Sequence, residues 1–304
     1  MNYDCAVKGE NISKKFKTFT LDIPDLRVPK GFATALIGEN GAGKTTLLNM
    51  LSGIRLDYKG ELTFFDKYSS EEKERRADVK NRIGYTGTGR YYLPQWTVSD
   101  VEEISSLLFD NFDRDEFERY CRELAIFPDS PDGVALKKKC SALSDGTRTK
   151  LMLAGVMARD TDLLLLDEPA SPLDPLMRDK LCQMIGDYIS DGAGEKSVLF
   201  STHNISDMES ITDYAIIMEH GNVVECGFVE DLKEKYILIK GDAQDTEAAS
   251  KILYTMTKNP YGFEGICIAE NLDKLAGMNV SKEIPSLFQI SVAVMKNNTK
   301  MVLK

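Results

Sequence analysis

Histidine is scarce in this chain of 304 residues, which contains only His203 and His220. Its six cysteines are scattered, without a C-x-x-C pair and without a histidine at metal-ligand spacing. Because a zinc site takes three or four such ligands, a metal cage based on histidine is not expected. The cysteines are expected to be reduced, packed thiols, and the cytoplasm suits them best.

Long apolar runs and an excess of positive charge are also missing. No stretch approaches the roughly 18 apolar residues that a membrane-spanning helix needs, and residues 1–5 do not begin a signal segment. The formal net charge is -10 and the pI is about 5.0, which gives no general attraction to nucleic acid or anionic lipid. We therefore expect a cytoplasmic protein with no nucleic-acid partner, which contacts a membrane only through a partner protein.

A glycine-rich segment at residues 38–45 reads GENGAGKT, the pattern of a phosphate-binding loop. The apolar run at 32–37 supplies the strand before it and residues 45–51 the helix after it, so a chance glycine turn is a poor alternative. Backbone N–H groups and the helix dipole converge on an anion in such a loop. Lys44 is expected to reach the β- and γ-phosphates of a nucleotide, and the Thr45 hydroxyl to bind Mg²⁺. The residues expected to hold the phosphates are Asn40, Gly41, Ala42, Gly43, Lys44, Thr45 and Thr46.

Two adjacent carboxylates end a second apolar run, DLLLLDEP at residues 162–169. A continuous aliphatic run is typical of a parallel strand buried on both faces, and ligands gather at the carboxyl ends of such strands. Asp167 is expected to face Mg²⁺ and Glu168 the attacking water. Taken alone, the pair would be interpreted as an ordinary acidic cap on a core strand.

The order of five motifs identifies a family. LSDGTR at 143–148, ASPLD at 170–174 and STH at 201–203 join the phosphate loop and the LLLLDEP strand, and together they resemble the ATP-binding cassette (ABC) ATPases. The resemblance covers about residues 1–228. It implies a P-loop ABC ATPase fold with a RecA-like parallel sheet core, an antiparallel β subdomain and a helical signature subdomain at about residues 89–157. Residues 229–304 are expected to form a small C-terminal α/β region.

The resemblance also implies a function and partners. Two cassettes of such proteins close head to tail around MgATP, as a homodimer or with a related second cassette. We expect an ATP-hydrolysing subunit that powers a separate transmembrane subunit, an exporter, at the inner face of the cell membrane. A soluble ABC ATPase that acts on an assembly scaffold, without a membrane partner, is the alternative.

Site residues carried over from the family complete the prediction. Ser144 and Gly146 would contact the γ-phosphate held by the partner cassette, and Asp174 would couple the two sites. His203 resembles the switch histidine that holds the water and the catalytic carboxylate in line. Phe16 falls where the family stacks an aromatic ring on adenine, although it could also be a core residue of an edge strand.

Two departures from the family pattern stand out. Thr88 occupies the position of a glutamine that reaches the metal and the water; a threonine hydroxyl approaches Mg²⁺ only through a bridging water. Gln95 could substitute, seven residues later in the chain. In lacking this glutamine, the chain resembles the single-cassette subunits of certain Gram-positive multi-component exporters. In the signature segment, Asp145 and Thr147 replace frequent glycine and glutamine, and Asp145 is expected to be a solvent-facing helix cap rather than a phosphate contact.

Two further regions carry weaker expectations. The aromatic stretch at residues 89–96 either docks the membrane subunit or fills the core beside the helical subdomain. The two interpretations are equally good for Trp96, whereas docking is the better one for Tyr91 and Tyr92. In the C-terminal region we expect helices at 231–236 and 247–257. Strands are expected at 236–240, 265–269 and 287–295.

Overall fold

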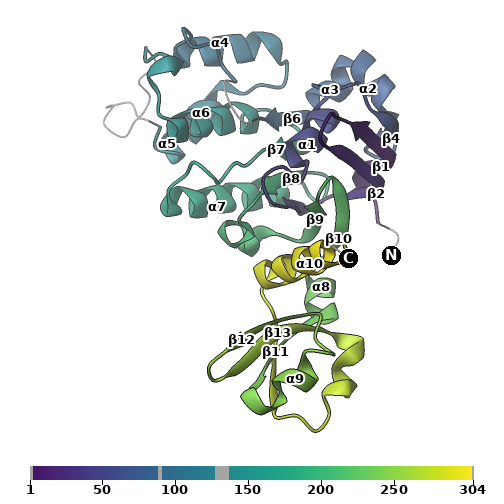
Figure 1. Ribbon diagram of the computed structural model, residues 1–304. Helices are drawn as coiled ribbons and strands as arrows, with labels where there is room; N and C mark the ends of the chain where they lie inside the picture. The colour runs from purple at the N-terminus through teal and green to yellow at the C-terminus, as the bar shows by residue number, and fades with distance from the viewer. Residues whose placement is uncertain (1–2, 88–90, 127–136, 303–304) are drawn as a thin grey trace.

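The computed structural model describes residues 3–87, 91–126 and 137–302, which form three sheets with helices around them (Figure 1). The central sheet has the strand order β10-β9-β3-β8-β7-β6, in which only β10 runs antiparallel to its neighbour. Every residue of β3, β7 and β8 is buried, and the sequence of β7 is aliphatic throughout, as expected for a strand covered on both faces. The strands are β3 (Ala33–Ile37), β6 (Ile83–Thr86), β7 (Leu163–Leu166), β8 (Ser197–Thr202), β9 (Tyr214–Glu219) and β10 (Asn222–Phe228).

Successive residues of these strands enter different cores, because side chains alternate between the two faces of a sheet. Leu163 and Leu165 pack in one core with α1 (Lys44–Ser52). Leu164 and Leu166 pack in the other core with α6 (Asp145–Met157) and α7 (Pro175–Asp191). The strand that carries the two carboxylates is therefore fixed from both sides.

A four-stranded antiparallel sheet, order β2-β1-β4-β5, covers the α1 side of the central sheet. Its inward residues, such as Ile12, Leu21 and Phe64, are fully buried in the core that contains α1. Two short helices follow its last strand. These elements are β1 (Cys5–Lys15), β2 (Thr20–Pro29), β4 (Lys59–Phe64), β5 (Tyr68–Ser69), α2 (Ser70–Arg75) and α3 (Ala77–Asn81).

The stretch that follows β6 contains two helices, α4 (Val98–Leu108) and α5 (Arg114–Glu123). Thr97 caps α4 in a reciprocal capping box with Asp100, and Asp113 caps α5. A 3₁₀ turn (Cys140–Ala142) leads into α6. Figure 1 shows these helices grouped beyond the β6 end of the central sheet.

The C-terminal region begins with α8 (Val229–Lys235) and builds a third sheet of order β12-β13-β11-β14. In Figure 1 this sheet lies below the central sheet. Its own small core contains Ile239, Phe263 and Cys267. The remaining elements are β11 (Tyr236–Asp242), α9 (Thr246–Ala249), β12 (Thr255–Asn259), β13 (Gly262–Ile268), β14 (Val280–Glu283), α10 (Leu287–Val302) and 3₁₀ helices Ile205–Asp207, Glu209–Ile211, Ala243–Asp245 and Ala269–Leu275.

Two of the C-terminal predictions are wrong. The expected strand at 287–295 is part of α10, whose buried positions Leu287, Ile290, Ser291 and Val294 follow helical spacing. The expected helix at 247–257 stops at α9, and residues 255–257 belong to β12. Within the described part of the chain, none of the helices combines the length and apolar character that crossing a membrane requires.

Candidate nucleotide site

The phosphate loop joins β3 to α1 at the carboxyl edge of the central sheet. Gly41 has φ +89° and Gly43 has φ +105°, left-handed conformations that glycine adopts without steric cost. Lys44 is only 5% exposed, and its Nζ donates to the carbonyl oxygens of Gly38 at 2.7 Å and Glu39 at 3.3 Å. The loop therefore surrounds the Lys44 side chain, and the N-terminus of α1 faces the phosphate pocket where Lys44 Nζ lies.

The Asp167 carboxylate meets the start of α1. Thr45 Oγ1 donates to Asp167 Oδ2 at 2.8 Å, and Ser201 Oγ donates to Oδ1 at 2.6 Å. A hydroxyl beside a carboxylate at a phosphate loop suits Mg²⁺, which takes one or two protein oxygens and completes its shell with phosphate and water. The described residues contain no group of three or more histidine, cysteine, aspartate or glutamate side chains able to hold a metal. The Thr45 hydroxyl and the Asp167 carboxylate fit a magnesium ion that arrives with a nucleotide.

Glu168 lies next to Asp167 but points elsewhere. Its carboxylate pairs with Lys44 Nζ at 3.3 Å and with His203 Nδ1 at 2.7 Å. The backbone at Glu168 has φ +50°, a strained conformation for a residue other than glycine. Its N–H donates to Ser201 Oγ at 2.9 Å, so the strained turn is held in place by the neighbouring strand.

Ser201 is a site residue that the sequence analysis did not single out. β7 and β8 are parallel neighbours with Leu166 opposite Phe200, so the next positions, Asp167 and Ser201, also lie side by side. One hydroxyl therefore holds both residues, because it donates to the Asp167 carboxylate and accepts from the backbone N–H of Glu168. The signal was present in the sequence, since this serine begins the STH segment.

A pocket of about 520 Å³ runs from the phosphate loop to Phe16. The Phe16 ring packs at 5.7 Å from Phe19, and the Arg55 guanidinium lies 5.2 Å from its centroid. Phe16 is half-buried and faces this pocket rather than the core. The predicted residues that line it are Phe16, Asn40, Gly41, Gly43, Lys44, Thr45, Thr46 and Glu168; Ala42 is buried behind the loop, where its carbonyl accepts from Gly221 N.

An adjoining cleft of about 550 Å³ separates the carboxylates from the first turns of α6. Asn40, Asp167, Glu168 and His203 line one side. Arg148 and other α6 residues line the other side. The cleft therefore brings Glu168 and His203 to one surface of the chain, and Lys44 lines the adjoining pocket.

The signature segment, LSDGTR at residues 143–148, lies at the start of α6 and not in the pocket at the phosphate loop. Ser144 is the N-cap of α6, and its Oγ accepts from Thr147 N at 3.1 Å. Asp145 pairs with Arg148, and its side chain is 87% exposed. It is solvent-facing as predicted, but the predicted capping role belongs to Ser144. A Cβ on Gly146 would lie 2.9 Å from the Pro172 carbonyl oxygen, so glycine allows the close approach of the ASPLD segment.

Other predicted residues lie apart from the nucleotide pocket. Asp174 is the N-cap of α7, accepting from Met177 N at 3.1 Å. Ser144, Gly146 and Asp174 are not among the described residues that line the pocket at the phosphate loop. Thr88 lies outside the described residues, and Gln95 is exposed and does not line either cavity.

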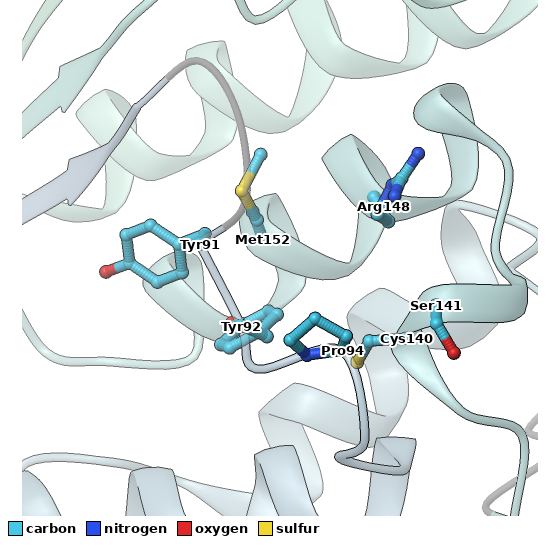
Figure 2. A pocket seen from close by; sticks show the side chains of 7 residues that line it. All are labelled: Tyr91, Tyr92, Pro94, Cys140, Ser141, Arg148 and Met152. Atoms are coloured by element: carbon cyan, nitrogen blue, oxygen red, sulfur yellow. The ribbon is translucent and has the colours of Figure 1, made fainter.

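The aromatic segment before α4 is divided between core and surface. Figure 2 shows Tyr91, Tyr92 and Pro94 beside Arg148 and Met152 of α6, around a cavity of about 70 Å³. Tyr92 and Trp96 pack against the core, with ring centroids 6.4 Å apart. Tyr91 is 43% exposed. In the isolated chain the core interpretation therefore suits Tyr92 and Trp96 better than docking does.

Comparisons with known proteins identify the family of this chain. A protein-family model described as ABC transporter matches residues 21–171. The chain is 25% identical, over 253 residues, to energy-coupling factor transporter ATP-binding protein EcfA2 of Lactobacillus gasseri, covering 82% of this chain and 85% of that one. The protein of the same name from Lactococcus lactis subsp. cremoris is 28% identical over 223 residues, which cover 71% and 74% of the two chains.

Solved structures give the same picture at the level of the fold. The ATP-binding subunit of an ABC transporter superposes with a TM-score of 0.63 at 21% identity, covering 75% of this chain and 92% of that one. A dimeric ATP-binding cassette in a post-hydrolysis state, bound to ADP and Pi, gives a TM-score of 0.62 at 20% identity, covering 73% and 98%.

Proposed function

Because this chain contains an ABC transporter ATP-binding domain and is an ABC ATPase, we propose that it hydrolyses MgATP as a dimer and thereby powers a separate transmembrane subunit. The observation that carries the catalytic part is the chain of contacts from Lys44 through Glu168 to His203 beside the phosphate loop. A cation for the phosphates, a carboxylate for the water and a histidine that orients the carboxylate are what phosphoryl transfer to water requires.

The roles of these side chains follow from their positions. Lys44 offsets charge on the γ-phosphoryl group from within the loop, where its low exposure strengthens the interaction. Glu168 orients the attacking water and accepts its proton. His203 bonds the Glu168 carboxylate and fixes its direction. Thr45 and Asp167 would hold Mg²⁺, which when bound neutralises charge on the phosphate oxygens.

Dimerisation supplies the rest of the proposed site. Ser144 and Gly146 stand at the exposed N-terminus of α6, where the helix dipole favours an anion. They lie apart from the phosphate loop of their own chain, and a second cassette, identical or related, brings its phosphate loop to them. Asp174, at the start of α7, is proposed to couple the two sites. The domain division proposed is a cassette of residues 1–228 and an accessory region of residues 229–304.

We also propose the kind of transporter that this chain serves. The missing glutamine resembles the pattern of exporter subunits, so we propose an exporter and a peripheral location of this chain at the inner face of the cell membrane. The alternative is a soluble ATPase that acts on an assembly scaffold. Purification of the tagged chain in mild detergent from its own cells tests this: recovery of a protein with several membrane spans supports transport, and recovery of only soluble scaffold proteins contradicts it.

Phe16 gives a prediction specific to the base. We expect Phe16→Ala to weaken ATP binding by about tenfold, because a base stacked on an aromatic ring is stabilised by about 1–3 kcal/mol. Phe16→Tyr is the matched control and should bind ATP as the native chain does. Titration with a fluorescent ATP analogue measures both. Equal affinity of the alanine variant and the native chain would remove Phe16 from the adenine site and return it to a packing role.

A further inference from the structure

Another cavity, of about 720 Å³, lies between the C-terminal sheet, α10 and the turn that joins β9 to β10. It is separate from the catalytic carboxylates and from the signature residues. Its walls come from segments far apart in the sequence: the outer face of β11 to β13, one side of α10, and the phosphate-loop residue Glu39. We call it the C-terminal cleft.

The register of the C-terminal sheet explains why one face of it is open. Ile239, Phe263 and Cys267 point into the small core of the C-terminal region. The alternate positions point the other way: Leu238 pairs with Ile266, and Thr257 pairs with Glu264. Part of this second face packs on the main core, and the rest lines the cleft.

The cleft is apolar along one wall and acidic at its rim. Phe288, which is 44% exposed, and Val292 present the apolar side of α10 to it. Glu39, Glu219 and Glu264 line it as well, and among the described residues of its lining they face a single lysine, Lys296.

The basic side chains nearest the acidic rim, Lys240 and His220, already lie beside carboxylates. Lys240, opposite Glu264 on β11, is bound by Glu283 at 2.6 Å. Glu219 is only 8% exposed, and its Oε2 accepts from Asn298 at 2.6 Å. His220 Nε2 lies 3.7 Å from the other Glu219 oxygen. A cation that enters the cleft therefore meets an excess of negative charge beside an apolar surface.

We propose that the C-terminal cleft binds a small amphipathic cation, an ammonium group carried on an apolar body. The apolar body lies along Phe288 and Val292, where removal from water favours binding. The ammonium group lies at the carboxylate rim, where charge-assisted hydrogen bonds orient it. An anion of the same shape is repelled by the same carboxylates.

The cleft has a direct structural link to the phosphate loop. Glu39 lines both the cleft and the nucleotide pocket, and its carbonyl accepts from Lys44 Nζ at 3.3 Å. The turn beside the cleft is bonded to the same loop, because Gly221 N donates to Ala42 O at 3.1 Å. The ligand is therefore expected to change ATP affinity, and by linkage ATP changes the affinity for the ligand. This coupling rests on the proposed ATP site, whereas binding to the cleft does not.

The binding step is tested on the full chain without nucleotide. Phenethylammonium is titrated by isothermal calorimetry, with 2-phenylethanol and phenylacetate as the neutral and anionic probes of the same size. We expect saturable one-site binding of the cation and at least tenfold weaker binding of the other two. Absence of saturable binding overturns the proposal, and so does equal binding of all three probes.

Variants place the binding in the cleft. Val292→Arg fills it with a cation and should abolish binding, whereas Ile284→Arg changes a side chain that is 77% exposed and not part of the cleft, and should leave binding unchanged. Glu264→Gln keeps the shape of the site and should weaken binding by about tenfold, the loss expected for one charge-assisted hydrogen bond. Native affinity in Glu264→Gln and Val292→Arg would overturn the proposal.

The coupling step is tested by titrating ATP with and without saturating phenethylammonium. A shift in ATP affinity of about fivefold or more is expected, at the lower end of ordinary coupling energies. An unchanged affinity overturns the coupling but leaves the cleft as a binding site. A chain that fails to bind ATP at all contradicts the proposed function, and the calorimetric result in the absence of nucleotide stands apart from that failure.

Discussion

Glu168→Gln is expected to reduce phosphate release by about 10²- to 10⁴-fold, the range that a general base contributes. The substitution keeps the size of the side chain and one oxygen for His203, but the amide cannot take a proton from water. ATP binding should survive, because the phosphate loop and Lys44 are unchanged. The variant should therefore accumulate as an ATP-bound dimer, measured by light scattering in the presence of MgATP.

The matched control for this substitution is Glu195→Gln. Glu195 forms a surface pair with Lys30 and its side chain is 65% exposed, so its loss should change neither hydrolysis nor dimerisation. Phosphate release at the native rate from Glu168→Gln would take the catalytic role away from Glu168. Loss of ATP binding would instead mean that the carboxylate supports the pocket through Lys44.

Much of the nucleotide-binding core could be predicted from local sequence. The aliphatic run before Asp167 is a strand buried on both faces, and the GENGAGKT segment joins a strand to a helix. These patterns are strong because burial and loop geometry each permit few residue types. The ABC ATPase fold and the ABC transporter ATP-binding domain predicted from the motif order are confirmed. The individual site residues stay predictions.

The segment at 287–295, expected as a strand and found in α10, shows where local sequence patterns fail. Ile290, Val292 and Val294 alternate with small or polar residues and resemble a strand. Their environment decides otherwise, because α10 packs its buried side against β9 and the main core. Ser286 and Gln289 form reciprocal bonds at its start, a capping-box signal that the sequence analysis overlooked.

Ser201 was missed for a different reason. Its role depends on the register between β7 and β8, two parallel strands that are separated in the chain by the whole of α7. Ser197, the first residue of β8, pairs with Leu163 at the start of β7, and the strands run in step from that pair, so Asp167 and Ser201 follow as neighbours. Sequence spacing alone does not give the register between strands that are joined by a helix. The same limit applies to the C-terminal cleft, whose walls meet only in the folded chain.

Lys44→Met is expected to weaken ATP binding by about 100-fold. The lysine is 5% exposed and is held by the carbonyl oxygens of Gly38 and Glu39, so its charge already points into the phosphate pocket. Hydrogen bonds to charged groups contribute about 1.5–3 kcal/mol each, and loss of two such bonds to the phosphates corresponds, at the lower end of that range, to roughly two orders of magnitude in affinity. Titration with a fluorescent ATP analogue measures the change.

Lys30→Met is the control for Lys44→Met, because it removes the same charge from a surface pair with Glu195 and should leave ATP affinity unchanged. Thermal unfolding of Lys44→Met separates lost binding from lost folding. The carboxylate of Glu168 keeps His203 as a partner in this variant, so the fold is expected to persist. A folded Lys44→Met chain with native ATP affinity would contradict the assignment of the phosphate site, since the one buried cation that the described phosphate loop offers would then have no part in binding.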